Sequence, residues 1–320
     1  MEIPPAGFCF AIFVQFVFRF NDSLYPGGDV CQCQPLRLRA ATTHQKSVLQ
    51  KRAACIRQMQ FKGLGFPNKH FELQNACSVA ILGLSKFFRE DAAVTAQTMQ
   101  IGNRPCRIYG RANAEYLLLQ MTGEHELQNM ESEVTAIAQS AHHFLFAAIP
   151  VESWNDALSP WEAPAVWGKQ GFGGKAGETL CLLTEQIIPS LKQQFRLPEN
   201  IKIILGGYSL AGLFALWAST QTDLFYGVAA ASPSVWFPGW MEFEQQHPIQ
   251  AQRVYLSLGD KEEHTKNAVM AAVGDNIRTL YSRLIERSTD CTLEWNSGGH
   301  FKDADLRTAK AFQWAMEERT

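Results

Sequence analysis

Short runs of nearly continuous apolar residues alternate with helical segments over the last two thirds of the 320-residue chain. Such runs are typical of strands buried on both faces of a sheet, and the segments between them place apolar residues on one helical face. The sequence therefore predicts an α/β fold, with a mainly parallel sheet covered by helices on both faces. The predicted strands are 106–110, 115–121, 143–150, 201–205, 225–232, 253–259 and 291–295, the first two at a sheet edge; the predicted helices are 125–141, 178–195, 210–220, 267–287 and 303–318.

The first 98 residues differ in charge from the rest of the chain. They carry 11 basic and 6 acidic side chains, whereas the remainder carries 18 basic and 25 acidic ones. The apolar run at 7–20 is shorter than the roughly 20 residues that span a bilayer as a helix, and no basic segment precedes it as in a secretory signal. We therefore expect 1–98 to be an extension of undetermined order outside the functional unit, and 99–320 to form a cytoplasmic functional domain.

Composition and motifs narrow the classes of partner and cofactor. The net charge of −2 argues against nucleic acid or an anionic membrane as a partner. Cys31, Cys33, His44 and Cys55 lack the paired spacing of a zinc site. The chain contains no HExxH and no dinucleotide-binding GxGxxG, so we expect neither a metal nor another cofactor.

A serine follows the predicted strand 201–205 in the sequence Gly-Gly-Tyr-Ser209-Leu-Ala-Gly. This nearly matches the G-x-S-x-G motif, which places a nucleophile at a tight turn between a strand and a helix. The residues two positions away must be small at such a turn, and Gly207 and Ala211 meet that requirement. Because the helix beginning at Leu210 has free N–H groups near Ser209, the turn favours an anionic intermediate.

A serine nucleophile needs a base and an acid that orients the base. His300 follows the predicted strand 291–295 in Asn-Ser-Gly-Gly-His, so its imidazole is expected at the sheet edge that presents Ser209. The acid is expected between serine and histidine in chain order, at the end of an intervening strand. Asp260 and Glu262 both follow the strand 253–259, and spacing does not choose between them.

These three turns together resemble the α/β-hydrolase superfamily, most closely its putative-esterase branch, which includes the esterase D-like and enterochelin-esterase-like hydrolases. The resemblance covers residues 100–316 and implies an α/β-hydrolase fold. It also implies that the acid lies three residues after the glycine that ends the strand, which favours Glu262 over Asp260. A second oxyanion donor is implied in the loop after 143–150, near Val151 to Trp154, and we assign it to the backbone of Trp154.

The segment 151–176 leaves the same sheet edge and is rich in aromatic residues. Because a long loop of this kind is usually functional, Trp161 and Trp167 are expected to line the substrate pocket, together with Tyr208 next to the serine. The alternative is an ordinary aromatic cluster that covers the end of the sheet.

We interpret the chain as a cofactor-free serine hydrolase acting on a small-molecule carboxylic ester, with the oligomeric state left open. Ser209 is the expected nucleophile, His300 the base and Glu262 or Asp260 the acid. Two alternatives remain: an esterase for siderophore trilactones of the enterochelin type, and a non-catalytic binding protein that keeps the fold.

Overall fold

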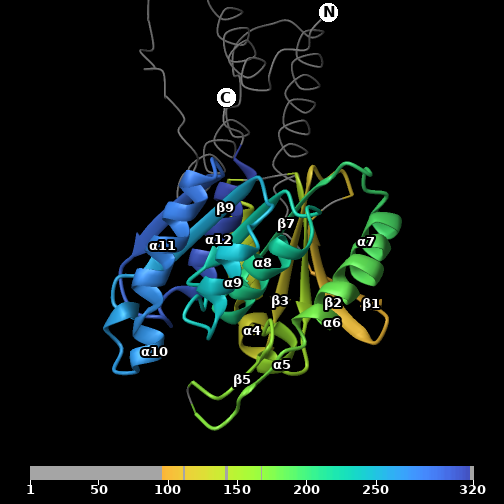
Figure 1. Cartoon of the computed structure of the whole chain (residues 1–320). Helices are drawn as coiled ribbons and strands as arrows, with labels where there is room; N and C mark the ends of the chain where they lie inside the picture. Colours follow the sequence, from red (N-terminus) through yellow and green to blue (C-terminus); the bar gives the residue numbers. More distant parts are fainter. Residues whose placement is uncertain (1–95, 111, 141–142, 167, 318–320) are drawn as a thin grey trace, which may run out of the picture. The chain divides into compact units, whose positions relative to one another are not determined.

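A computed structural model describes residues 96–110, 112–140, 143–166 and 168–317. Its main feature is an eight-stranded sheet in the order β1-β2-β4-β3-β7-β8-β9-β10 (Figure 1). The six strands from β4 to β10 in this order run parallel, and β1 and β2 are antiparallel additions at one edge. The strands are β1 Gln97–Ile101, β2 Arg104–Gly110, β3 Tyr116–Thr122, β4 Phe144–Pro150, β7 Lys202–Tyr208, β8 Gly227–Ala231, β9 Arg253–Gly259 and β10 Asp290–Asn296.

Helices cover both faces of the sheet. Side chains alternate between the faces along each strand, so that Leu117 and Leu119 of β3 join one core and Leu118 joins the other. The first core includes α6 to α9 and α11, and the second includes α4 and α12. The helices are α4 Glu124–Ile137, α5 Trp154–Leu158, α6 Ala176–Leu182, α7 Ile188–Phe195, α8 Leu210–Gln221, α9 Trp240–Gln246, α10 Ala268–Ala271, α11 Val273–Glu286 and α12 Ala304–Met316; a π-turn, Leu183–Ile187, joins α6 to α7.

The predicted mainly parallel α/β architecture is confirmed, with local differences. Residues 115–121 were expected at a sheet edge, but β3 lies in the interior between β4 and β7. The expectation was wrong because its neighbours are set by crossover connections that local sequence does not encode. The elements that were not predicted are the edge strand β1 and the short elements α5, β5 Glu162–Ala163, β6 Phe172–Gly173 and α9. β1 is polar and mostly exposed, and the others are two to seven residues long.

The strand order brings the loops after β4 and β7 to the two sides of β3. In open α/β sheets, ligands bind at the carboxyl edge where the strand order reverses in this way. The loop after β4 contains α5 and an antiparallel pair of two-residue strands, β5 Glu162–Ala163 and β6 Phe172–Gly173. No helix in the described part of the chain is both long and apolar enough to cross a membrane.

Residues 1–95 of the expected extension, including the apolar run at 7–20, lie outside the described residues. β1 begins at Gln97, before the expected boundary at Met99, and its first two residues pair with Ile108 and Arg107. We therefore propose that the folded unit starts at or before Gln97.

We expect a chain shortened to begin at Ala96 to fold cooperatively with nearly the full melting temperature, because it keeps all eight strands. A chain beginning at Met99 should melt lower, since it loses two residue pairs of the edge strand. Calorimetry on the two shortened chains and the full chain tests this. An insoluble or non-cooperative protein starting at Ala96 would show that earlier residues belong to the same unit.

Glu133 is an acidic side chain buried between α4 and β3. It accepts a hydrogen bond from Gln120 Nε2 at 3.3 Å, and its other carboxyl oxygen has no partner. Burial, with smaller contributions from Asp305 and Glu126, raises the pKa of Glu133 to about 8. Because the folded state therefore holds a proton that the unfolded chain has released, this group's contribution to stability is lost as pH rises from about 4.5 to 8.

The variant Glu133→Gln should remove that loss. We expect the free energy of unfolding of this variant to equal that of the natural protein near pH 4.5. At pH 8 it should be higher by on the order of 2–4 kcal/mol. Urea unfolding between pH 4.5 and 8 measures the difference, with the exposed Glu124→Gln on the same helix as the control. A constant difference across this pH range would contradict the assignment.

Candidate active site

Ser209 lies at a strained turn between β7 and α8. Its φ is 57° and its ψ is −119°, a conformation that residues with a side chain rarely adopt. Three backbone hydrogen bonds hold it there: its N–H donates to Ala231 at 3.1 Å, and its carbonyl accepts from Leu213 at 3.1 Å and Ser234 at 3.0 Å. The surrounding structure thus imposes a backbone geometry that presents the Ser209 hydroxyl at the carboxyl edge of the sheet.

The small residues around Ser209 leave space for this turn. A Cβ at Gly207 would lie 2.6 Å from the Cβ of Ala211, so glycine is required at one of these positions and alanine is the limit at the other. A Cβ at Gly212 would lie 3.0 Å from the Gly207 carbonyl oxygen. The alanine that departs from the G-x-S-x-G pattern therefore fits because Gly207 faces it.

His300 and Glu262 form a continuous hydrogen-bonded chain with Ser209. The Nε2 atom of His300 is 3.0 Å from Ser209 Oγ, and its Nδ1 atom is 2.7 Å from Glu262 Oε2. With Nδ1 protonated, His300 donates to the carboxylate and Nε2 accepts the proton of the serine hydroxyl. These hydrogen bonds join residues that are far apart in the sequence: Ser209 and His300 are 91 positions apart, and Glu262 and His300 are 38 positions apart.

The Glu262 carboxylate is buried and fully hydrogen-bonded. Its Oε1 atom accepts from the N–H of Gly259 at 2.7 Å, from the hydroxyl of Ser232 at 2.8 Å and from Arg307 Nη1 at 3.2 Å. The other oxygen is left for the imidazole. These donors fix Oε1 in place, so Oε2 is held toward His300.

Asp260 has a different position in the same loop. Its Oδ1 accepts from the N–H of Gly298 at 2.7 Å, and its own N–H donates to the carbonyl of Asn296 at 2.8 Å. These bonds join the loop after β9 to the loop that carries His300. The structure therefore brings Glu262 to the imidazole and Asp260 to the backbone beneath it.

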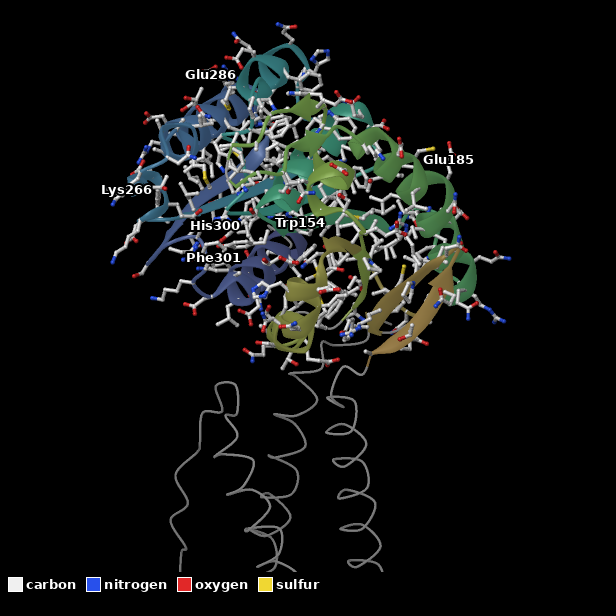
Figure 2. The ribbon with its side chains drawn as sticks, turned by 90° about the horizontal axis from the view of Figure 1, so that it is seen from below. Trp154, Glu185, Lys266, Glu286, His300 and Phe301 are labelled. Carbon is white, nitrogen blue, oxygen red and sulfur yellow. The ribbon has the colours of Figure 1, made fainter. Side chains whose placement is uncertain are left out.

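The remaining predicted site residues are spread over the same end of the molecule. Figure 2, seen from below the view of Figure 1, shows His300 and Trp154 near the middle of this face, with Phe301 beside His300. Trp154 begins α5, and its ring lies where a Cβ at Gly123 would be 3.4 Å away. Leu210 is buried and begins α8, so its N–H belongs to the first turn, which lacks intrahelical acceptors.

The predicted pocket aromatics have mixed positions. Trp161 donates from its indole N–H to the Pro238 carbonyl and packs against Phe237 and Phe243, which matches the alternative of an aromatic cluster. Tyr208 is buried and donates from its hydroxyl to the His300 carbonyl at 2.6 Å. Burial raises the pKa of Tyr208, which keeps this donor protonated. Trp167 lies outside the described residues.

Sequence reasoning missed several polar side chains around the triad. Ser234 has its hydroxyl 3.3 Å from that of Ser209, and Ser232, at φ 43°, donates to Glu262. Arg307 lies on the buried face of α12, at helical spacing from Ala311 and Ala315. A charged residue on an otherwise apolar helical stripe was the one available signal for Arg307.

Within the described residues, no three His, Cys, Asp or Glu side chains gather closely enough to hold a metal ion. A depression of about 560 Å³ lies against the loop after β4; it is lined by Asp156, Glu162, Ala163, Pro164, Gln170, Gly171, Phe172 and Gly173.

A known protein family matches the part of the chain that carries most of this site. Residues 119–296, more than half of the chain, match the family Esterase, described as "Putative esterase". The chain belongs to this esterase family. The match begins within β3 and ends at the last residue of β10, so it contains Ser209 and Glu262 and stops four residues before His300. No curated protein sequence matches the chain.

Solved structures share the fold of this esterase at low sequence identity. An IroE-like serine hydrolase from Shewanella oneidensis has a TM-score of 0.58 and 16% identity, over 69% of this chain and 79% of its own. The siderophore hydrolase EstA from Aspergillus nidulans has a TM-score of 0.52 and 18% identity, over 70% and 94%. The BES protein from Bacillus cereus has a TM-score of 0.52 and 16% identity, over 71% and 96%. The α/β-hydrolase fold expected from the sequence is thereby confirmed.

The two acids near His300 should respond differently to isosteric replacement. We expect Glu262→Gln to lower kcat for an aryl ester by about 10³- to 10⁴-fold, because the imidazole loses the acceptor that orients it. Asp260→Asn keeps an oxygen for the Gly298 N–H and should lower kcat by less than about tenfold. Rates and melting temperatures of both variants provide the test, and loss of turnover in Asp260→Asn alone would reverse the assignment.

Proposed function

We propose that Ser209, His300 and Glu262 are the catalytic triad with which this esterase hydrolyses small-molecule carboxylic esters. The observation that carries the proposal is the hydrogen-bonded chain from Glu262 through His300 to Ser209, with distances of 2.7 and 3.0 Å. The strained backbone of Ser209 at the strand–helix turn supports the same role.

In the first half of the reaction, Ser209 Oγ attacks the ester carbonyl carbon while His300 Nε2 takes the hydroxyl proton. The tetrahedral intermediate then collapses: the bond to the alcohol oxygen breaks, and the imidazolium gives its proton to that oxygen. Glu262 stabilises the imidazolium between these two steps. The products are a free alcohol and an acyl group on Ser209.

In the second half, water attacks the acyl-enzyme and His300 takes a proton from it. In the second tetrahedral intermediate the bond between the acyl carbon and Ser209 Oγ breaks, the carboxylic acid leaves, and the His300 imidazolium gives its proton to Ser209 Oγ. Both intermediates carry an oxyanion. The N–H of Leu210 at the start of α8 and the backbone N–H of Trp154 are the proposed donors to it, each contributing about 3–4 kcal/mol of transition-state stabilisation.

The class of ester is narrowed by the surface beside the triad. Phe301 follows His300, is 92% exposed and packs edge-on against the imidazole, with ring centroids 5.3 Å apart. This aromatic surface favours an ester with an aromatic or other apolar group. A siderophore trilactone is the second candidate, because structures described as siderophore hydrolases share this fold.

A cytoplasmic location stays a prediction, which cell fractionation tests.

Replacement of the nucleophile tests the proposal. Ser209→Ala should lose more than about 99.9% of aryl-ester hydrolysis and all labelling by a fluorophosphonate probe, without a fall in melting temperature. Ser219→Ala, which removes a hydroxyl bonded to the Leu216 carbonyl within α8, is the matched control and should keep both.

An unlabelled natural protein with no turnover would instead favour a non-catalytic binding role. If the natural protein does hydrolyse esters, its rates for aryl, short-chain and trilactone esters, compared at equal enzyme concentration, rank the two substrate candidates.

A further inference from the structure

Arg307 is a buried cation directly beneath the proposed triad. It lies on α12, is 4% exposed, and its guanidinium reaches four segments of the chain, one of them through Ser232 at 3.5 Å. Nη1 is 3.2 Å from Glu262 Oε1 and 3.1 Å from the Tyr208 hydroxyl, while Nη2 donates to the Ser297 carbonyl at 3.3 Å. None of these contacts belongs to the reacting atoms, so Arg307 acts through other residues.

The contact between Arg307 and Glu262 helps to set the direction of that carboxylate. Arg307, Ser232 and the Gly259 N–H all donate to Oε1, which leaves Oε2 facing His300. Glycine at 259 makes room for this arrangement, since a Cβ there would lie 2.9 Å from Glu262 Oε1 and 3.0 Å from Arg307 Nη1.

The other contacts connect Arg307 to the segment that carries the base. Tyr208 receives a hydrogen bond from Arg307 and donates its own proton to the His300 carbonyl at 2.6 Å. Ser297, bonded to Nη2, begins the turn that leads to His300. One guanidinium therefore holds the acid directly and the backbone of the base through Tyr208 and Ser297.

We propose that Arg307 is a positioning residue of this esterase, which keeps Glu262 ionised and aimed at His300. The inference rests on the proposed triad and extends it. Arginine suits the position because its planar group donates in two directions from one buried site, which a lysine ammonium cannot reproduce. A buried carboxylate that loses its cation faces a large cost of ionisation.

The expected pH effect follows from the groups that face Arg307. These are Glu262, Tyr208, His300 through Tyr208, and Tyr255 of β9. Without the cation, either Glu262 takes a proton and no longer supports the imidazolium, or it stays charged and draws a proton onto His300. Both outcomes lower the fraction of active enzyme at low pH, so the acid limb of the pH–rate profile moves to higher pH.

The experiment compares Arg307→Met with Arg253→Met. Arg253 is a matched control, because it is 5% exposed, pairs with Asp290 at 2.9 Å and binds the far end of α12 through the Ala315 carbonyl. In Arg307→Met we expect kcat for an aryl ester to fall about 10- to 100-fold, with KM within about threefold, and the acid limb to move by about one pH unit. Arg253→Met should lower the melting temperature and leave the pH profile in place.

Further variants separate positioning from folding. Arg307→Lys keeps the charge and should keep the pH profile while losing part of kcat. The double variant Glu262→Gln/Arg307→Met buries no unpaired charge, and it should be within about threefold of Glu262→Gln alone. An unchanged pH profile in folded Arg307→Met, or a further large loss in the double variant, overturns the proposal.

A measurement without turnover separates this proposal from the proposed function. The Nδ1 proton of His300, bonded to Glu262, should give a downfield proton NMR signal that is absent in His300→Gln. We expect the signal in the natural protein and in Arg253→Met, and its loss or displacement in Arg307→Met. If the natural protein hydrolyses no ester, the proposed function fails, while this signal still decides the role of Arg307: an unchanged signal in folded Arg307→Met contradicts it.

Discussion

The level register of the parallel strands is the constraint on which the candidate site depends. Tyr208 of β7 pairs with Ala231 of β8, Ala231 with Ser257 of β9, and Ser257 with Glu294 of β10. The loops after β9 and β10 therefore start level with each other, two residues beyond the end of β7, on the same edge of the sheet. A slip of one residue in any of these strands would turn its side chains to the opposite face and separate Ser209, Glu262 and His300.

A buried charge pair also helps to hold the loops at this edge of the sheet in one arrangement. Glu262 and Arg307 have side chains that are 5% and 4% exposed, and removing either partner alone leaves an unpaired ion in the core. The pair connects α12, on one face of the sheet, to loops at its carboxyl edge. Stability and the geometry of the candidate site are thus coupled here: the contacts that satisfy the buried charges also hold Glu262 toward the imidazole.

Local pattern was sufficient for most elements and for the turn that presents Ser209. The apolar runs at 143–150, 201–205 and 253–259 match β4, β7 and β9, because strands buried on both faces must be apolar throughout. The local sequence pattern did not predict β1, a polar edge strand, or the interior position of β3. Edge strands need only one partner and one buried face, so their sequences carry little signal.

The sequence by itself determined the α/β class and the small residues that permit the strained turn at Ser209, and it predicted the chain order serine, acid, histidine for the proposed triad. It left Asp260 and Glu262 as alternatives, because both lie in the same loop and loop side chains have no periodicity. Tertiary structure decided their positions, with Asp260 on the Gly298 N–H and Glu262 on the imidazole. It also placed Arg307 there, since only packing of α12 against the sheet brings a residue 45 positions away to the buried carboxylate.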